Sequence, residues 1–219
     1  MLSMLGIMLK DFYETFCIKK NLLGFVFSIL LYCFIFFLMP SEYIIILLVA
    51  LSVPMMSVSP LQYSIERDEI SKFDQILLTY PISKKQIVIT KILETYIFTA
   101  ICQLVLSLPI ILMSVYGYHI LDLQEGLLIL SVGIIFSLIM LPINNAGFMA
   151  LGNKKGAIMY VILLVAFVIG FIALNFVVGI EQLLLIPLNN WLLYGSILAV
   201  ILNILGYFAC LKIYDIKHS

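Results

Sequence analysis

The chain has 219 residues, of which 64% are hydrophobic and only 11% are Asp, Glu, Lys or Arg. Soluble domains carry about 25% charged residues, so this composition is typical of a membrane protein and excludes an ordinary soluble fold. Basic and acidic residues number 12 each, so no overall charge points to nucleic acid.

The first twenty residues predict an amphipathic helix lying in the headgroup layer of a membrane. They include Asp11 and Glu14 and place no basic residue before the apolar ones, which is unlike a cleaved signal peptide. An alternative is that they form only the first turns of a membrane span. The apolar residues that can share one helical face are Leu5, Met8, Leu9, Phe12 and Phe16.

Six segments are long and apolar enough to predict membrane-spanning helices, which need about 20 residues each. The sequence therefore predicts an all-α polytopic protein with a single transmembrane domain over residues 1–219, because no stretch between spans is long enough for a soluble domain. The predicted spans are Leu22–Met39, Tyr43–Leu61, Ile92–Val115, Leu127–Phe148, Ala157–Val178 and Trp191–Leu211.

The basic residues predict the orientation of these spans. Cytoplasmic loops of membrane proteins carry an excess of Lys and Arg. All 12 basic residues fall before span 1, between spans 2 and 3, between spans 4 and 5, or after span 6. Both termini are therefore expected in the cytoplasm.

The stretch ERDEISKFDQILLTYPISKKQIVITK, residues 66–91, is the one strongly polar part of the chain. Ile70, Phe73 and Ile76 recur at helical spacing among charged residues, which predicts an amphipathic helix of about three turns. Pro81 predicts its end near Thr79–Tyr80, and Ser83 with Gln86 predicts a capping box that starts the next helix. This pattern fits either a solvated interfacial loop or a helix that docks into a soluble partner.

The polar stretch and its two flanking spans resemble permeases of the ABC-two exporter superfamily, most closely the compact permeases that pair with separate ATPases. Examples are the permeases of phenol-soluble modulin exporters and of antimicrobial-peptide immunity systems. The larger members have an ordered extracellular insertion before span 6, of which residues 179–190 would be a short version. The residues that match the superfamily pattern are Glu66, Asp68, Glu69, Lys72, Asp74, Leu77, Leu78, Pro81, Ser83, Lys84, Gln86, Ile87, Val88 and Lys91.

The resemblance implies a permease subunit of an ATP-driven exporter that moves an amphipathic substrate, such as a peptide, lipid or drug. It also implies a multi-pass protein in the plasma membrane of a bacterial cell. Two copies, or one copy and a paralogue, would form the pore, and each would receive an ATPase subunit holding ATP and Mg. A coupling helix would contact that ATPase through Glu66, Arg67, Asp68, Glu69, Ile70, Lys72, Phe73, Asp74, Ile76 and Leu77.

The chain itself lacks the motifs of catalysis. It contains no HExxH and no GxSxG, and Asn153 occupies the position where a P-loop has lysine. Four cysteines without CxxC spacing and two histidines predict no metal site. We therefore expect no enzymatic activity and no cofactor in this chain, with ATP hydrolysis in a partner.

A few polar and adaptable side chains inside the spans are candidates for a substrate path. Amides in hydrocarbon need partners, so they either hydrogen-bond between helices or line a polar cavity. The candidates are Met55, Met56, Gln103, Asn144, Asn145 and Asn175.

Two other function classes remain open at this stage. One is the substrate-binding six-span subunit of a vitamin importer, or a secondary carrier, which would have a closed pocket and no dependence on residues 66–77. The other is a membrane scaffold or intramembrane enzyme, which the missing catalytic motifs disfavour. Substrate identity, and homodimer against heterodimer, do not follow from the sequence.

Overall fold

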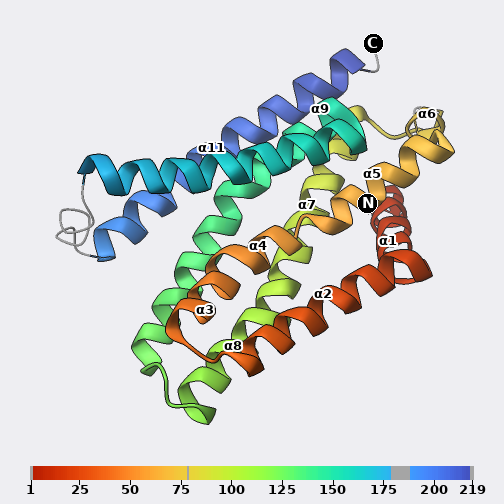
Figure 1. Cartoon of the computed structure of the whole chain (residues 1–219). Coiled ribbons are helices and arrows are strands. Elements are labelled where there is room, and N and C mark those ends of the chain that lie inside the picture. The colour runs from red at the N-terminus through yellow and green to blue at the C-terminus, as the bar shows by residue number, and fades with distance from the viewer. Residues whose placement is uncertain (1, 78, 179–187, 218–219) are drawn as a thin grey trace.

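The computed structural model describes residues 2–77, 79–178 and 188–217, which form helices joined by short turns, with no strand among them (Figure 1). This confirms the predicted all-α class. The elements in chain order are α1 (Leu2–Phe16), α2 (Lys19–Leu38), α3 (Glu42–Ile46), η1 (Leu47–Ser52), α4 (Val53–Met56), α5 (Ser59–Ser71), α6 (Phe73–Leu77), α7 (Lys84–Cys102), η2 (Gln103–Ser107), α8 (Leu108–Leu112), η3 (Met113–Gly117), α9 (Leu123–Val178) and α11 (Leu188–Lys217).

Four helical stretches among the described residues are long and apolar enough to cross a membrane: Lys19–Leu38, Lys84–Gly117, Leu123–Leu163 and Asn189–Lys217. The second span expected from sequence is instead divided among α3, the π-helical η1, α4 and the start of α5. The fifth falls in the later part of α9, where several side chains are not described. The structure thus supports a polytopic helical protein through four long helices.

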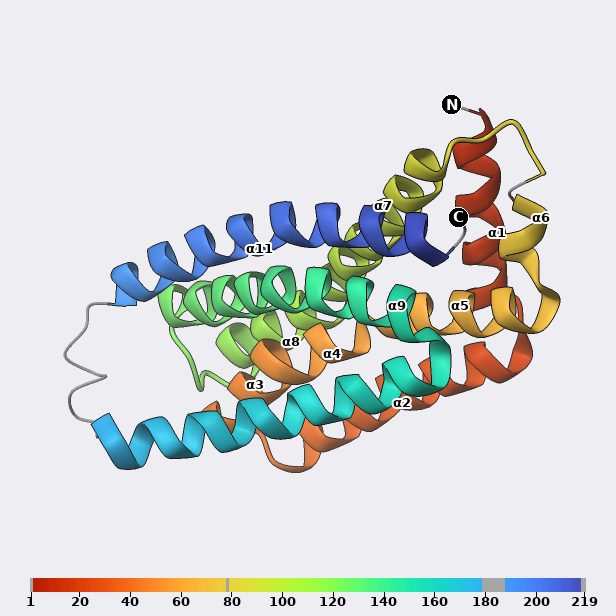
Figure 2. The same cartoon turned by 90° about the horizontal axis from the view of Figure 1, so that it is seen from above.

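The long helix α9 reverses direction at Gly152. This residue has φ 75° and ψ −174°, a conformation that is essentially restricted to glycine. Figure 2 shows the two arms of α9 leading away from this turn, with α11 beside the first arm. Gly206 of α11 lies directly against Pro142 of α9, so the missing side chain permits close approach of the two helices.

One end of the molecule gathers segments from the whole chain. Figures 1 and 2 place α1, α6, the turn at Gly152 and the end of α11 together at this end. We call it the basic end, because all 12 Lys and Arg residues lie on the segments that meet there. The turns at residues 39–41 and 118–122 lie at the opposite end.

The amphipathic pattern of α1 is divided differently from the prediction. Leu5 and Leu9 are exposed together with Tyr13. Phe12 and Phe16 instead face inward and stack on Phe98 of α7, with ring centroids 6.1 and 5.3 Å away. Helix α1 is therefore docked on the bundle through one face and leaves a second apolar stripe open.

The segment before α7 confirms one local prediction and refines another. Ser83 accepts a hydrogen bond from the backbone N–H of Gln86, whose side chain accepts one from the backbone N–H of Ser83. The capping box is therefore present. The expected helix over 66–77, however, is interrupted at Lys72, which adopts a left-handed conformation with φ 53° between α5 and α6.

Candidate functional site

A buried ionic cluster joins three elements at the basic end. At its centre is Lys91 of α7, whose side chain is only 7% exposed. Its Nζ lies 2.6 Å from Oδ2 of Asp11 in α1 and 2.8 Å from Oδ2 of Asp68 in α5. It also donates to the hydroxyl of Ser64. One lysine thus fastens α1 and α5 to the start of the long α7 helix.

Lys10 of α1 completes the cluster from the other side. Its Nζ lies 3.1 Å from Oδ1 of Asp11 and 3.2 Å from Oε2 of Glu14, and it also donates to Asp68. The same ammonium group stands 4.1 Å from the ring centroid of Phe73, a cation–π arrangement. Lys10 therefore connects α1 with both α5 and α6.

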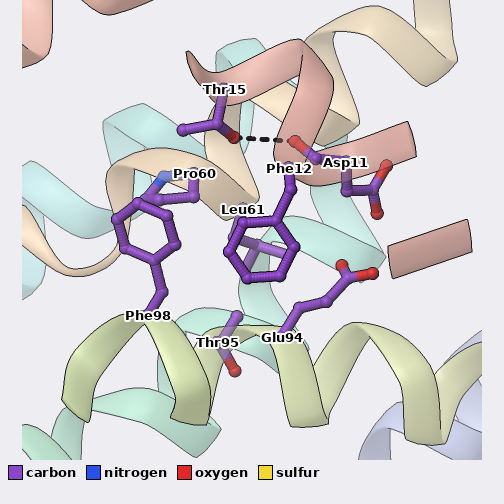
Figure 3. Close-up of a pocket in the computed structure, with 8 residues that line it drawn as sticks. All are labelled: Asp11, Phe12, Thr15, Pro60, Leu61, Glu94, Thr95 and Phe98. Atoms are coloured by element: carbon purple, nitrogen blue, oxygen red, sulfur yellow. Dashed lines mark hydrogen bonds between the residues drawn. The ribbon is translucent and has the colours of Figure 1, made fainter. Parts of the chain in front are cut away.

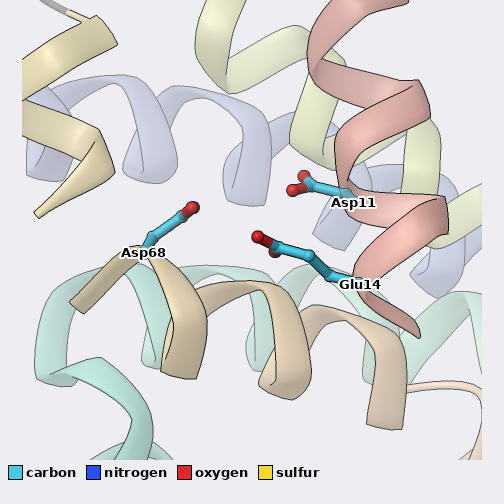
Figure 4. Close-up of side chains that lie close together, drawn as sticks. All are labelled: Asp11, Glu14 and Asp68. Atoms are coloured by element: carbon cyan, nitrogen blue, oxygen red, sulfur yellow. The ribbon is translucent and has the colours of Figure 1, made fainter. Parts of the chain in front are cut away.

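Three carboxyl groups of the cluster converge in a way that could suggest a metal site. Asp11, Glu14 and Asp68 lie close enough to share one cation, and Figure 4 shows them pointing toward a common centre. The two lysine ammonium groups, however, already contact all three carboxylates. The cluster is therefore an ion-pair network in which the two lysines partly neutralise the carboxylates.

The electrostatics of α1 follow from this network. Burial would raise the pKa of Asp11. The positive charges of Lys91 and Lys10, together with the hydrogen bond that Lys91 donates, lower it to about 2. Burial and Lys91 would lower the pKa of Lys10, yet Asp11 and Asp68 raise it above its ordinary value. Both groups are thus held in their charged forms at neutral pH.

The residues expected to form the coupling helix divide into inward and outward sets. Asp68 belongs to the ionic cluster, Leu77 is buried with Ile87 and Val88, and Phe73 packs at the edge of that core. Glu66 pairs with Lys20 at 3.1 Å. Arg67 is partly exposed. Four side chains are exposed and face outward: Glu69, Ile70, Lys72 and Ile76. The side chain of Asp74 lies outside the described set.

Glu69 connects this segment to the turn of α9. Its Oε1 accepts a hydrogen bond of 2.9 Å from the backbone N–H of Asn153. The carboxylate occupies the space where a side chain at Gly152 would stand. The side chain of Glu69 therefore connects α5 to the turn between the two arms of α9.

The outward set forms an apolar patch among charges. Ile70 is 68% exposed and Ile76 is 45% exposed, and Tyr80 is exposed nearby in the sequence. Phe73, predicted as part of this apolar surface, is instead partly buried beneath Lys10. The exposed anchors of the segment are therefore the two isoleucines, which α5 and α6 present on either side of the break at Lys72.

The candidate path residues lie mainly where helices meet. Gln103 donates to the hydroxyl of Ser137 at 3.0 Å, and Asn145 donates to that of Thr95 at 3.0 Å. Asn144 is buried, and within the described part of the chain its amide has no hydrogen-bond partner.

The methionines and the remaining amide add little to a path. Met56 packs in the core with Phe98 and Cys102. The side chains of Met55 and Asn175 lie outside the described set. The structure therefore brings Gln103, Asn144 and Asn145 to the inner surfaces of α7–η2 and α9, without joining all six candidates into one site.

Sequence reasoning missed the ionic cluster as a unit. A lysine and two aspartates at the edges of apolar runs were visible, but Asp11 and Lys91 are 80 positions apart. The only signal available was that Asp11 and Lys91 lie within stretches that are otherwise largely apolar. Charged groups in such places are usually paired.

Comparison with known proteins extends over nearly the whole chain. The sequence profile of the family described as "ABC-2 family transporter protein" matches residues 6–215. The matched range includes the ionic cluster, both arms of α9 and the segment from α5 to α7. No individual curated protein and no solved structure matched the chain.

Proposed function

The chain belongs to the ABC-2 family of transporter proteins, and from this membership we propose that it is the permease subunit of an ATP-driven exporter. The whole of residues 1–219 would act as one transmembrane domain with six spans. The substrate would be amphipathic. We favour a peptide over a lipid or a drug. ATP and Mg would bind in a separate ATPase subunit.

The observation that carries this proposal is the braced, exposed surface of α5 and α6. Ile70 and Ile76 stand in solvent at the basic end, beside Glu69 and Lys72. Asp68, on the inner side of the same helix, is held by two lysines. A small apolar anchor with flanking charges suits a protein partner, because the apolar contact gives affinity and the charges give register.

The distribution of basic residues supports the orientation that such docking requires. All 12 lie on segments at the end that carries Ile70. The positive-inside rule places that end in the cytoplasm, where ATP is available. The ATPase would therefore meet the permease at α5 and α6.

The character of the substrate is inferred from the interior. The helices carry abundant Phe, Leu and Ile, while the buried amides Gln103, Asn144 and Asn145 provide hydrogen-bonding groups between α7–η2 and α9. An interior of this kind suits a molecule with apolar side chains and a polar backbone. A second copy or a paralogue would supply the other wall of the pathway.

The proposal is tested by Ile70→Asp, with Ile216→Asp as a matched control. Both isoleucines are 68% exposed, and both lie at the basic end. The tagged permease would be co-expressed with the ATPase encoded nearest to it, and both co-purification and ATP-dependent export would be measured. We expect Ile70→Asp to lose both and Ile216→Asp to keep both.

Two results would contradict the proposal. One is intact ATPase binding and export in Ile70→Asp. The other is substrate movement by the purified permease in vesicles without any ATPase. Ile70 is a better position than Phe73 for this test, because Phe73 also packs under Lys10 and its loss would disturb the fold.

A further inference from the structure

A small cavity lies where α1, α5 and α7 meet, beside the ionic cluster. Its volume is about 20 Å³, enough for about one water molecule. Figure 3 shows the carboxyl groups of Asp11 and Glu94 next to each other at its edge. The residues lining it are Asp11, Phe12, Thr15, Pro60, Leu61, Glu94, Thr95 and Phe98.

Glu94 is a buried carboxyl group without a cationic partner of its own. The residue is 9% exposed, and its Oε1 has no hydrogen-bond partner in the described part of the chain. Its carboxyl group lies beside that of Asp11 (Figure 3). Ionised carboxylates can only accept hydrogen bonds, so two adjacent carboxyl groups repel each other unless one of them holds a proton and donates it to the other.

The neighbouring charges decide which carboxyl group carries this proton. Both oxygens of Asp11 already accept hydrogen bonds, from Lys10 and Lys91 respectively, so Asp11 is stabilised as the anion. Glu94 has no such donor and is the group that holds the proton. The charged groups that act on Glu94 are Asp11 and Lys10 of α1 and Lys91 of α7, and the hydroxyl-bearing residues that line the same cavity are Thr15 and Thr95.

The charge balance of this region leads to the same assignment. Two lysines face four carboxyl groups: Asp11, Glu14, Asp68 and Glu94. Four ionised carboxylates would leave two negative charges in excess within a poorly solvated volume. A proton on Glu94 halves that excess and converts the contact between Glu94 and Asp11 from repulsion into a hydrogen bond.

We propose that Glu94 is a proton-binding site: its carboxyl group holds a proton, donates it to Asp11 across the boundary between α7 and α1, and releases it to the adjoining cavity at higher pH. Release breaks the hydrogen bond and leaves two adjacent carboxylates. Their repulsion weakens the docking of α1. All residues of this site belong to one chain, so the proposal does not depend on which ATPase or substrate the protein binds.

The direct test is infrared spectroscopy of the full-length protein in lipid nanodiscs at neutral pH. A protonated carboxylic acid has a carbonyl-stretching band that a carboxylate lacks. We expect this band in the wild type and its loss in Glu94→Gln. Glu42→Gln, an exposed glutamate at the opposite end, serves as the control and should leave the band unchanged.

A wild-type titration keeps the proposal testable even if Glu94→Gln folds poorly. The band should disappear as the pH is raised, and the thermal unfolding midpoint should fall in the same range. Glu94→Gln, which stays neutral and can still donate to Asp11, should show a midpoint that no longer falls over that range. Absence of the acid band from the wild type at neutral pH, or equal bands in wild type and Glu94→Gln, would overturn the assignment.

Discussion

Lys91 is the residue on which the docking of α1 and α5 depends most. Its ammonium group serves two buried aspartates, and no other cation in the described structure contacts Oδ2 of Asp11. Lys91 lies in α7 one residue before Ile92, where the sequence predicts that the third span begins. A single side chain thus links the N-terminal helix to the segment proposed to meet the ATPase.

We expect Lys91→Met to lower the free energy of unfolding by about 3–5 kcal/mol, because the aspartates remain buried without their shared cation. Thermal or denaturant unfolding in detergent would measure this. Lys84→Met is the matched control: its partner Asp215 lies 3.6 Å away and is well exposed, so the loss should be at most about 1 kcal/mol. Equal effects of the two substitutions would show that the Lys91 network adds little stability.

Gly152 provides a second test at the scale of a residue. Its backbone conformation is essentially reserved for glycine, and the Glu69 carboxylate fills the position of a Cβ atom. We expect Gly152→Ala to destabilise the protein by about 1–3 kcal/mol through backbone strain, together with loss of the contact between Glu69 and Asn153.

Gly117→Ala is the control for that substitution, because open space surrounds Gly117 and its backbone is not strained. Unfolding in detergent would compare the two. If Gly152→Ala were as stable as Gly117→Ala, the turn between the arms of α9 would not have the rigidity that the structure indicates.

At the scale of elements, α1 is held by charge as well as by Phe12 and Phe16. The pKa of Asp11 is lowered from an ordinary 3.8 to about 2, so its ionised form is favoured in the folded state. A depressed carboxyl pKa contributes stability that is present above the ordinary pKa and is lost as the pH falls through the folded value. The docking of α1 should therefore weaken between about pH 4 and pH 2.

Unfolding midpoints measured across that acidic range would check this expectation. Asp11→Asn, which keeps the size of the side chain but has no proton to gain, should lose the part of the acid dependence that comes from this group. Lys10 and Lys91 would then have fewer anionic partners, so the variant should also be less stable at neutral pH. An unchanged acid profile in Asp11→Asn would assign the acid sensitivity to other carboxyl groups.

Elements with local signals were predictable, and those that depend on distant contacts were not. The Ser83–Gln86 capping box depends on a pattern of only four consecutive residues, and the structure contains it. The break at Lys72 has no comparable signal, because a left-handed lysine is uncommon and the hydrophobic spacing favoured one continuous helix. That break explains why Phe73 faces Lys10 while Ile70 and Ile76 remain exposed.

The same distinction applies to the interior. Hydropathy alone located the four long apolar helical stretches of the described residues, but it did not show that the predicted second span is divided among shorter elements. The family resemblance of residues 66–91 agrees with the profile match over residues 6–215. Which polar groups meet depends on helix packing. The pairs Gln103–Ser137 and Asn145–Thr95 could not be assigned without the arrangement of α7 against α9.

At the scale of the whole molecule, the structure separates a charged end from an apolar body. Helices α2 and α11 expose rows of large apolar side chains, including Phe27, Phe34 and Phe208, as expected for contact with lipid or with another subunit. The ionic cluster, the exposed isoleucines and the turn at Gly152 are all concentrated at the basic end. Helix α5 contacts α1 through the pair of Asp68 with Lys10, and α9 through the hydrogen bond between Glu69 and Asn153.

The membrane orientation gives the final prediction. The basic end should face the cytoplasm, and the turn at residues 118–122 should face outward. In a variant whose four native cysteines are replaced, Tyr118→Cys should react with a membrane-impermeant thiol reagent on intact cells. Ile70→Cys should react only after the cells are permeabilised. Both side chains are exposed in the structure, so a difference in labelling reports sidedness rather than burial. The reverse pattern would place α5 and α6 outside the cell, where a cytoplasmic ATPase could not reach them.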